Sequence, residues 1–280
     1  GLKKRANREE VWFLCSTNPL CSNNNTRLRP SFLFLPAIFL LFTASTAHAG
    51  PYEACVELVA RDADTAYDHA LRWGDEGGGA AALHCGILAL TKLELYDAAA
   101  TRLEQLAARS DAGGAQERAL ILQQAGASWL KHGDVKRAIA AYSAGIDLDP
   151  QNAALLTARG RAYLLGGEAE LAITDLSRAA ELAPQEGEIY LLRARAGRQT
   201  GALEAARRDI AAAESAGAAP LLLRLERGLI AEEMGDKDSA REDWLYVQAN
   251  AQEDSAEAEA ARAYLAQMDV TQESAATGAN

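Results

Sequence analysis

The chain has 280 residues and a formal net charge of −11 at neutral pH. This acidic balance argues against a nucleic-acid binder, which needs a basic face to displace counterions from phosphates, and an anionic membrane surface would repel it. Hydrophobic residues make up 49% and charged residues 24%, which excludes a disordered chain, and the aromatic share of 6% disfavours an all-β fold.

Residues 1–26 match neither a targeting signal nor a folded domain. The first residue is Gly1, and the only methionines are Met234 and Met268. We therefore expect this stretch to be a non-native or mis-started leader, and we leave it out of the reasoning about the fold.

Residues 27–49 have the features of a secretory signal peptide. Arg27 and Arg29 precede an apolar run over 32–42, and the sequence A-H-A ending at Ala49 places small residues before a cleavage site. The apolar run is shorter than the ~20 residues that span a bilayer. We expect cleavage after Ala49 and a periplasmic or secreted chain without stable membrane insertion; the alternative is an uncleaved anchor.

The two cysteines that follow this signal are Cys55 and Cys85. In an oxidising compartment, a cysteine pair on neighbouring helices indicates one structural disulfide. The alternative is a pair of buried free thiols, because cysteine is among the residues most often buried.

Residues 50–118 predict degenerate helical hairpins. We expect an amphipathic helix over 54–73, part of a second helix over 84–90, and a third helix over 93–108. The Gly-rich stretches 75–79 and 110–114 mark turns between them.

A period of about 34 residues organises the chain from residue 119 onward. Three series share it: Gly133, Gly167, Gly201 and Gly235; Ala138, Ala172, Ala206 and Ala240; and Gly126, Gly160, Ala194 and Gly228. The first series is expected to end a helix in the left-handed conformation, and Asp134 and Asp236 are placed to cap the helix that follows. The third series is expected where another helix crosses too closely to leave room for a side chain. A fixed period of this length indicates an array of helical repeats.

The best unit, 119–152, carries Trp129, Gly133, Ala138, Tyr142 and Pro150 at positions where they resemble the tetratricopeptide repeat, a helix-turn-helix unit of about 34 residues. The resemblance covers four repeats over 119–254 and is to an exported bacterial type. It implies an all-α, right-handed superhelical solenoid of five or six hairpins. A capping helix over 255–269 and a disordered tail over 270–280 would follow.

In this family a concave groove, lined by the first helix of each hairpin, typically holds an extended peptide or a partner helix. The resemblance therefore implies a protein or peptide partner. It places in the groove Gln123, Ala127, Leu130, Lys131, Thr157, Arg161, Leu164, Leu165, Leu191, Arg195, Arg198, Gln199, Leu225, Leu229, Glu232 and Glu233. The basic and amide residues with which some members grip a C-terminal carboxylate are not reproduced, so that function is not carried over.

Two features of this predicted groove leave alternatives open. The three arginines Arg161, Arg195 and Arg198 are suited to bind an acidic segment through bidentate pairing. Alternatively they pair with carboxylates of the chain itself, those of Glu168, Glu188 or Asp209, or lie in water. The leucines Leu222, Leu225 and Leu229 either hold an apolar anchor of the partner or belong to the core.

Nothing in the sequence indicates catalysis. It contains no Gly-rich phosphate loop after a strand, no H-E-x-x-H and no C-x-x-C. His84 lies beside Cys85, but adjacent residues on a helix point in different directions, and a disulfide-bonded cysteine is not a nucleophile. We predict no enzymatic activity, no cofactor, no metal and no nucleic-acid partner.

Two functions of different classes remain. The first is a periplasmic scaffold or adaptor that binds a segment of a partner protein in its groove. The second is an accessory or regulatory subunit of an envelope enzyme or assembly complex, which would present a larger apolar face. Self-association through the ends of the array is a further structural possibility.

Overall fold

The structure, a computed structural model, describes residues 50–277, and the predicted leader and signal segment lie outside them. The described residues form helices and no strands. In chain order these are α1 (Pro51–Arg61), α2 (Ala63–Trp73), η1 (Gly74–Gly78), α3 (Gly79–Lys92), α4 (Tyr96–Ala108), α5 (Ala115–His132), α6 (Val135–Leu148), α7 (Ala153–Leu165), α8 (Ala169–Leu182), α9 (Gly187–Gln199), α10 (Leu203–Ser215), α11 (Pro220–Glu233), α12 (Lys237–Asn250) and α13 (Ala256–Thr277).

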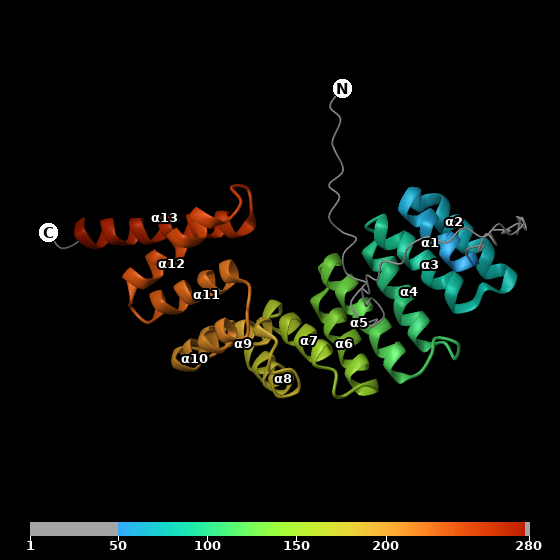
Figure 1. Cartoon of the computed structure of the whole chain (residues 1–280), viewed down its shortest axis with the longest axis horizontal. Coiled ribbons are helices and arrows are strands. Elements are labelled where there is room, and N and C mark those ends of the chain that lie inside the picture. The colour runs from blue at the N-terminus through green and yellow to red at the C-terminus, as the bar shows by residue number, and fades with distance from the viewer. Residues whose placement is uncertain (1–49, 278–280) are drawn as a thin grey trace, which may run out of the picture. The chain divides into compact units, whose positions relative to one another are not determined.

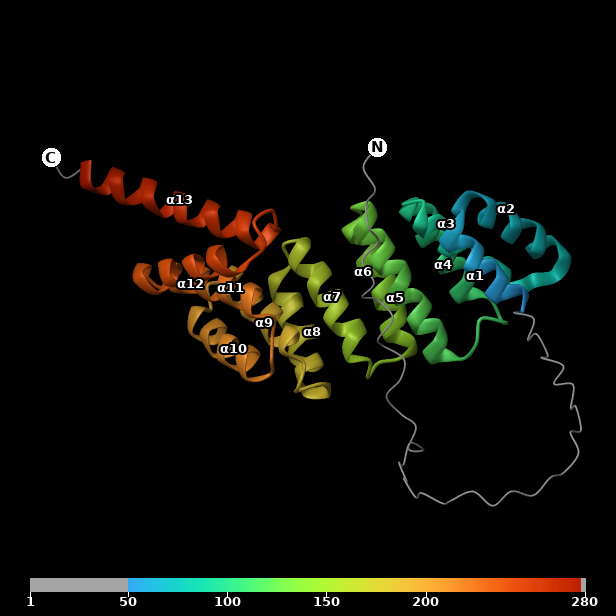
Figure 2. The same cartoon turned by 45° about the horizontal axis from the view of Figure 1, so that its top comes forward.

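Consecutive helices pack as antiparallel hairpins, each beside the next, as Figures 1 and 2 show for this part of the chain. The four predicted repeats correspond to α5 with α6, α7 with α8, α9 with α10, and α11 with α12. Within residues 50–277, no helix has the length and apolar character needed to cross a membrane.

The ends of the first helix in each repeat follow the predicted chemistry. The four glycines at these ends, Gly133, Gly167, Gly201 and Gly235, adopt φ values of 92°, 77°, 76° and 87°. This is the left-handed region, which glycine adopts without a Cβ clash. The Asp134 and Asp236 side chains then cap α6 and α12 by accepting hydrogen bonds from the backbone N–H groups three residues later.

The small residues inside the first helices mark close helix crossings, also as predicted. A Cβ atom on Gly126 would lie 2.4 Å from the ring of Tyr142 on α6. A Cβ on Gly228 would lie equally close, 2.4 Å, to the indole nitrogen of Trp244 on α12. Because no real Cβ atom tolerates such distances, these positions require glycine for the hairpin to close.

The core of the array runs between the two helices of each hairpin and into the next hairpin. Its largest buried side chains include Trp129, Leu155 and Leu176, and Trp244 is buried near the C-terminal end. The α13 helix covers that end, and the ring centroid of its Tyr264 lies 5.1 Å from that of Trp244. The terminal helix therefore shields the apolar face that the last hairpin would otherwise expose to water.

Two boundaries differ from the sequence prediction. Residues 54–73 do not form one helix, because the chain breaks at Asp62, which ends α1 and whose carboxylate caps α2 by accepting from the N–H of Thr65. The predicted disordered tail is helical as far as Thr277, since residues 271–277 contain neither Gly nor Pro.

The N-terminal hairpins are held together by a covalent bond. A disulfide joins Cys55 on α1 to Cys85 on α3, whose Cα atoms lie 6.2 Å apart, and both residues are buried. The predicted pairing is therefore present in the structure, in place of two free thiols. The Gly-rich turn before α3 is also confirmed, with Gly77 at φ 94°.

Candidate functional site

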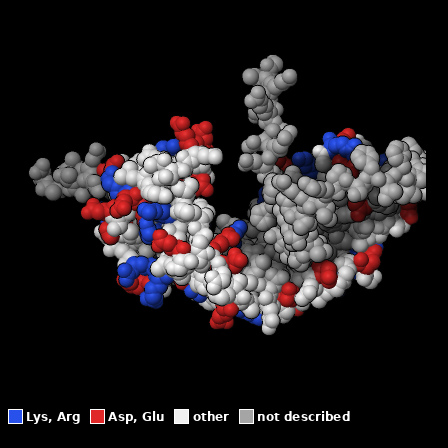
Figure 3. All heavy atoms as spheres, in the orientation of Figure 1, with Lys and Arg blue, Asp and Glu red and all other residues white. Residues whose placement is uncertain are grey.

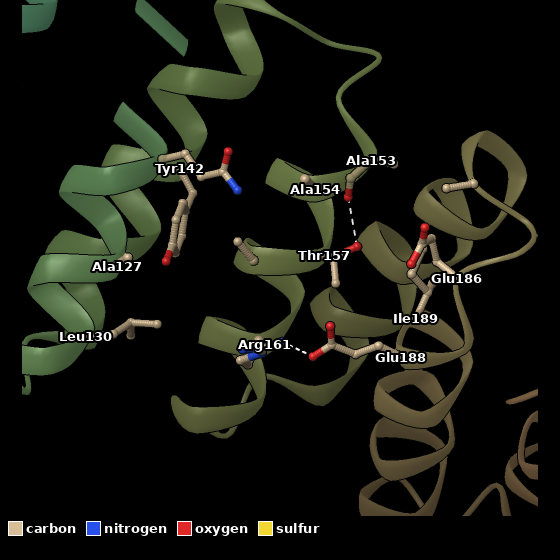
Figure 4. Close-up of a pocket in the computed structure, with 13 residues that line it drawn as sticks. Ala127, Leu130, Tyr142, Ala153, Ala154, Thr157, Arg161, Glu186, Glu188 and Ile189 are labelled. Carbon is tan, nitrogen blue, oxygen red and sulfur yellow. Dashed lines mark hydrogen bonds and ion pairs between the residues drawn. The ribbon is translucent and has the colours of Figure 1, made fainter. Parts of the chain in front are cut away.

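A cleft of about 700 Å³ opens between α5, α7 and α9. Figure 4 shows its walls: Ala127 and Leu130 on α5, Thr157 and Arg161 on α7, and Ile189 on α9. The full lining is Gln123, Ala127, Leu130, Tyr142, Ala153, Ala154, Thr157, Ala158, Arg161, Ala183, Glu186, Glu188 and Ile189. Alanines recur in this lining, so the backbone of α5 and α7 is covered only by methyl groups at those points.

Some predicted groove residues come together in this cleft. Gln123, Ala127 and Leu130 of the first repeat line it with Thr157 and Arg161 of the second repeat. Their grouping follows from the register of the repeats, because corresponding positions of two successive first helices face the same side of the array. Whether these residues bind a partner stays a prediction.

Other predicted groove residues lie elsewhere. The side chains of Leu164 and Leu191 are 8% and 6% exposed and pack in the core, so they are not available to a partner. Lys131 is exposed and lies 5.2 Å above the ring of Tyr96 rather than in the cleft. Leu165 is exposed outside the cleft.

The leucines at the C-terminal end divide between the two alternatives. Leu225 and Leu229 are half-buried and pack, as Tyr264 does, against the cluster that contains Trp244 and Leu265, so they belong to the core of the last hairpin and its cap. Leu222 remains exposed. Because α13 packs against α11, this end offers less open apolar surface than the isolated leucines suggest.

The three predicted groove arginines are all engaged in ion pairs. Arg161 pairs with Glu188 of α9, one of the partners considered from the sequence. Arg195 and Arg198 both donate to Glu226 of α11, at 3.1 and 2.6 Å, and Glu226 is only 1% exposed. These carboxylates neutralise the positive charges of the three arginines, to which an acidic partner would otherwise bind.

The cleft itself is more acidic than basic. Its lining holds one cation, Arg161, against two carboxylates, those of Glu186 and Glu188. Since Arg161 is paired with Glu188, Glu186 is an exposed carboxylate without an ion pair to any described residue. Where described side chains are visible in Figure 3, acidic and basic residues are interspersed.

A repeated, partly buried ion pair was not predicted from the sequence. It joins a first-helix arginine to an aspartate sixteen residues later: Arg159 to Asp175, Arg193 to Asp209, and Arg227 to Asp243. Each pair is bidentate, with distances between 2.6 and 2.9 Å, the geometry in which a guanidinium binds a carboxylate best. Successive pairs recur with the same period as the glycines, and that spacing was the signal available in the sequence.

His84 is a half-buried ionisable group of the N-terminal hairpins. His84 lies beside the disulfide and its Nδ1 is 2.6 Å from the hydroxyl oxygen of Tyr52, while burial lowers the pKa of the imidazole. Among residues 50–277, no group of three or more His, Cys, Asp and Glu side chains is arranged to hold a metal ion.

Comparison with known proteins identifies the architecture. No family model and no curated protein sequence matches the chain. Among solved structures, MamA 41-end from Desulfovibrio magneticus RS-1 superposes with a TM-score of 0.54 at 18% identity, covering 61% of this chain and 94% of that one. The MamA RS-1 ArsTM double mutant gives the same TM-score and identity, with 61% and 93% covered.

A shorter match is the second TPR of Spaghetti (RPAP3) bound to HSP90 peptide SRMEEVD, at 30% identity over 34% of this chain and 89% of that one. Its TM-score is 0.34. At 18% identity, the likeness to MamA concerns the fold alone. Together with the fixed period of the sequence and the stacked hairpins, it shows that the described residues have the fold of a tetratricopeptide-repeat solenoid.

Proposed function

We propose that the chain is a non-enzymatic scaffold or adaptor that binds a segment of a partner protein in the cleft between α5, α7 and α9. The observation that supports this most directly is the cleft itself, because three successive first helices line it and several of its lining residues are alanines. An extended segment fits such a surface better than a compact small molecule, which would need a more enclosed and apolar pocket.

The charges of the cleft favour a segment that carries a basic residue. Glu186 has no ion pair among the described residues, and Arg161 is already matched by Glu188. A lysine or arginine of the partner would therefore meet an unpaired carboxylate, while an acidic residue would have to displace Glu188. Exposed ion pairs contribute little, about 0 to 1 kcal/mol, so this preference sets selectivity more than affinity.

Filling the cleft with a large side chain tests the proposal. Ala154 lines the cleft and is exposed, whereas Ala144 is also exposed, lies on α6 and does not line the cleft. We expect a partner recovered from an envelope fraction with the native chain and with Ala144→Trp to be lost with Ala154→Trp. Recovery with all three chains would place binding outside the cleft, and recovery with none would count against a scaffold.

We further propose that the chain works in the periplasm or outside the cell. The disulfide between Cys55 and Cys85 supports this, because such bonds persist in oxidising compartments, and the apolar run before Ala49 resembles a signal peptide. N-terminal sequencing of the chain from an envelope fraction should begin at Gly50. An uncleaved chain with free thiols in the cytosolic fraction would contradict the proposal.

A further inference from the structure

The hydroxyl group of Tyr142 has an unusual environment. Tyr142 is only 2% exposed, yet it lines the cleft, and its hydroxyl makes no hydrogen bond to any described residue. Figure 4 shows the hydroxyl end of the ring directed into the space between α5 and α7. Among the described residues, every side-chain nitrogen or oxygen that is fully shielded from solvent has a hydrogen-bond partner. The Tyr142 hydroxyl has no such partner, so its oxygen must be accessible to solvent and to a ligand in the cleft.

The corresponding positions of the other repeats show that this is not required by the fold. Leu176 and Ile210 occupy the same place one and two periods later, and neither has a polar side-chain atom. Trp244, three periods later, satisfies its indole N–H by donating to the carbonyl of Leu225 at 3.4 Å. Tyr142 alone among these four brings a polar group to the cleft without a partner inside the described chain.

The Tyr142 hydroxyl is protonated and can therefore donate a hydrogen bond. Burial raises the pKa of Tyr142 to about 12, although the nearby charge of Arg161 acts in the opposite direction. The phenol therefore keeps its proton at any physiological pH. A neutral donor at the floor of a cleft pairs best with an acceptor that can approach closely.

The surroundings of Tyr142 let a polypeptide backbone make that approach. Ala127 and Ala154 line the same cleft with methyl groups only. Gln123 also lines it, and its amide makes no hydrogen bond to the described residues. A carboxamide offers both a donor and an acceptor, which is the pair of groups that a peptide unit presents.

Building on the peptide binding proposed above, we propose that the Tyr142 hydroxyl donates a hydrogen bond to a main-chain carbonyl of the partner's segment, and that the Gln123 amide bonds an adjacent peptide group. The cleft then recognises an extended main chain through these two residues. Glu186 at the rim selects among side chains.

The test uses the full chain and, as probe, a library of acetylated decapeptide amides with one position at a time fixed as lysine. Tyr142→Phe keeps the ring and removes only the hydroxyl. Tyr163→Phe is the matched control, because Tyr163 does not line the cleft and lies under the guanidinium of Arg159. Circular dichroism and thermal unfolding should show all three chains equally folded.

We expect Tyr142→Phe to weaken every bound peptide about 5- to 10-fold, the net effect of one neutral hydrogen bond, whereas Tyr163→Phe has no effect. Replacing single amides of the best peptide by esters should identify one position where the wild-type chain loses affinity and Tyr142→Phe does not. Gln123→Met should weaken binding by a similar factor.

Three results would overturn the proposal in different ways. Binding by Tyr142→Phe equal to wild type would remove the main-chain role and leave binding in the cleft intact. A loss confined to peptides with one kind of side chain would show that the hydroxyl reads a side chain instead. If the wild-type chain binds no peptide of the library, cleft binding itself fails, and this inference fails with it.

Discussion

Replacement of Asp175 by alanine removes the acceptor of two hydrogen bonds from Arg159, at 2.7 and 2.8 Å. The Asp175 side chain is 8% exposed and the Arg159 side chain 20%. The change therefore leaves a guanidinium without its counter-charge at the interface between α7 and α8. A guanidinium stays protonated at any physiological pH, so Arg159 cannot relieve the unpaired charge by losing its proton.

The expected cost follows from this geometry. Removing one partner of a fully buried pair costs about 3 to 5 kcal/mol. Arg159 retains some contact with water and keeps a hydrogen bond to Ser143 at 3.0 Å, so we expect about 2 to 3 kcal/mol for Asp175→Ala. For an array of this size, that corresponds to a melting temperature lower by about 4 to 12 °C.

Chemical denaturation followed by circular dichroism measures this difference, and hydrogen exchange of α7 and α8 locates it. Glu204→Ala is the matched control, since Glu204 pairs with Arg207 on the surface, where the side chains are 62% and 66% exposed; it should change stability by less than about 0.5 kcal/mol. A combined Arg159→Met and Asp175→Leu variant should recover most of the loss. The reasoning is refuted if Asp175→Ala costs no more than Glu204→Ala.

Three further changes test the fold. Gly126→Ala places a Cβ 2.4 Å from the Tyr142 ring and should destabilise the fold by about 1 to 3 kcal/mol through overpacking. Gly133→Asn should cost less, because nothing lies within 4 Å of the new Cβ and asparagine tolerates the left-handed region. Equal losses of stability for the two variants in urea denaturation would contradict this. Double alanine replacement of the disulfide cysteines, which are 30 residues apart, should lower stability by about 3 to 4 kcal/mol, and a reductant that left the native melting temperature unchanged would oppose it. Burial lowers the pKa of His84, so the unfolded chain binds a proton below pH 6.5 that the folded chain does not; stability should therefore fall as pH drops from 6.5 through the folded pKa, by at most about 1.4 kcal/mol per pH unit. His84→Gln should flatten this slope, and an unchanged slope would assign it to other groups.

The parts of the fold that could be predicted are those that depend on a residue and its neighbours in the sequence. Gly133 ends one helix through its left-handed backbone, and Asp134 begins the next helix through its capping side chain. The glycine recurs in each of the four repeats. Gly126 likewise indicates a close crossing without any knowledge of its neighbour. The helix break at Asp62 also depends on local chemistry, the capping of α2 by its carboxylate. The apolar pattern continues across Asp62, however, so the periodicity predicts a single helix over 54–73.

The site was less predictable because it depends on contacts between hairpins. Leu164 and Leu191 lie at the edge of the groove-facing stripe, where a small rotation of the helix moves a side chain into the core. The pairing of Arg195 and Arg198 with Glu226 requires the distance between α9 and α11. In the sequence, Tyr142 is recognisable only as a signature position of the repeat. That its hydroxyl is accessible from the cleft depends on the packing of the neighbouring helices.

The covalent bond between α1 and α3 makes the two ends of the array unequal. In a solenoid each hairpin is held only by its neighbours, so unravelling starts at an end and proceeds one unit at a time. The disulfide prevents the first units from separating, whereas α13 is held only by noncovalent packing on α11 and α12. Loss of structure is therefore directional, from the C-terminal end towards Cys85, and a protease that needs a loose end would shorten the chain from that side while the N-terminal hairpins stay intact longest.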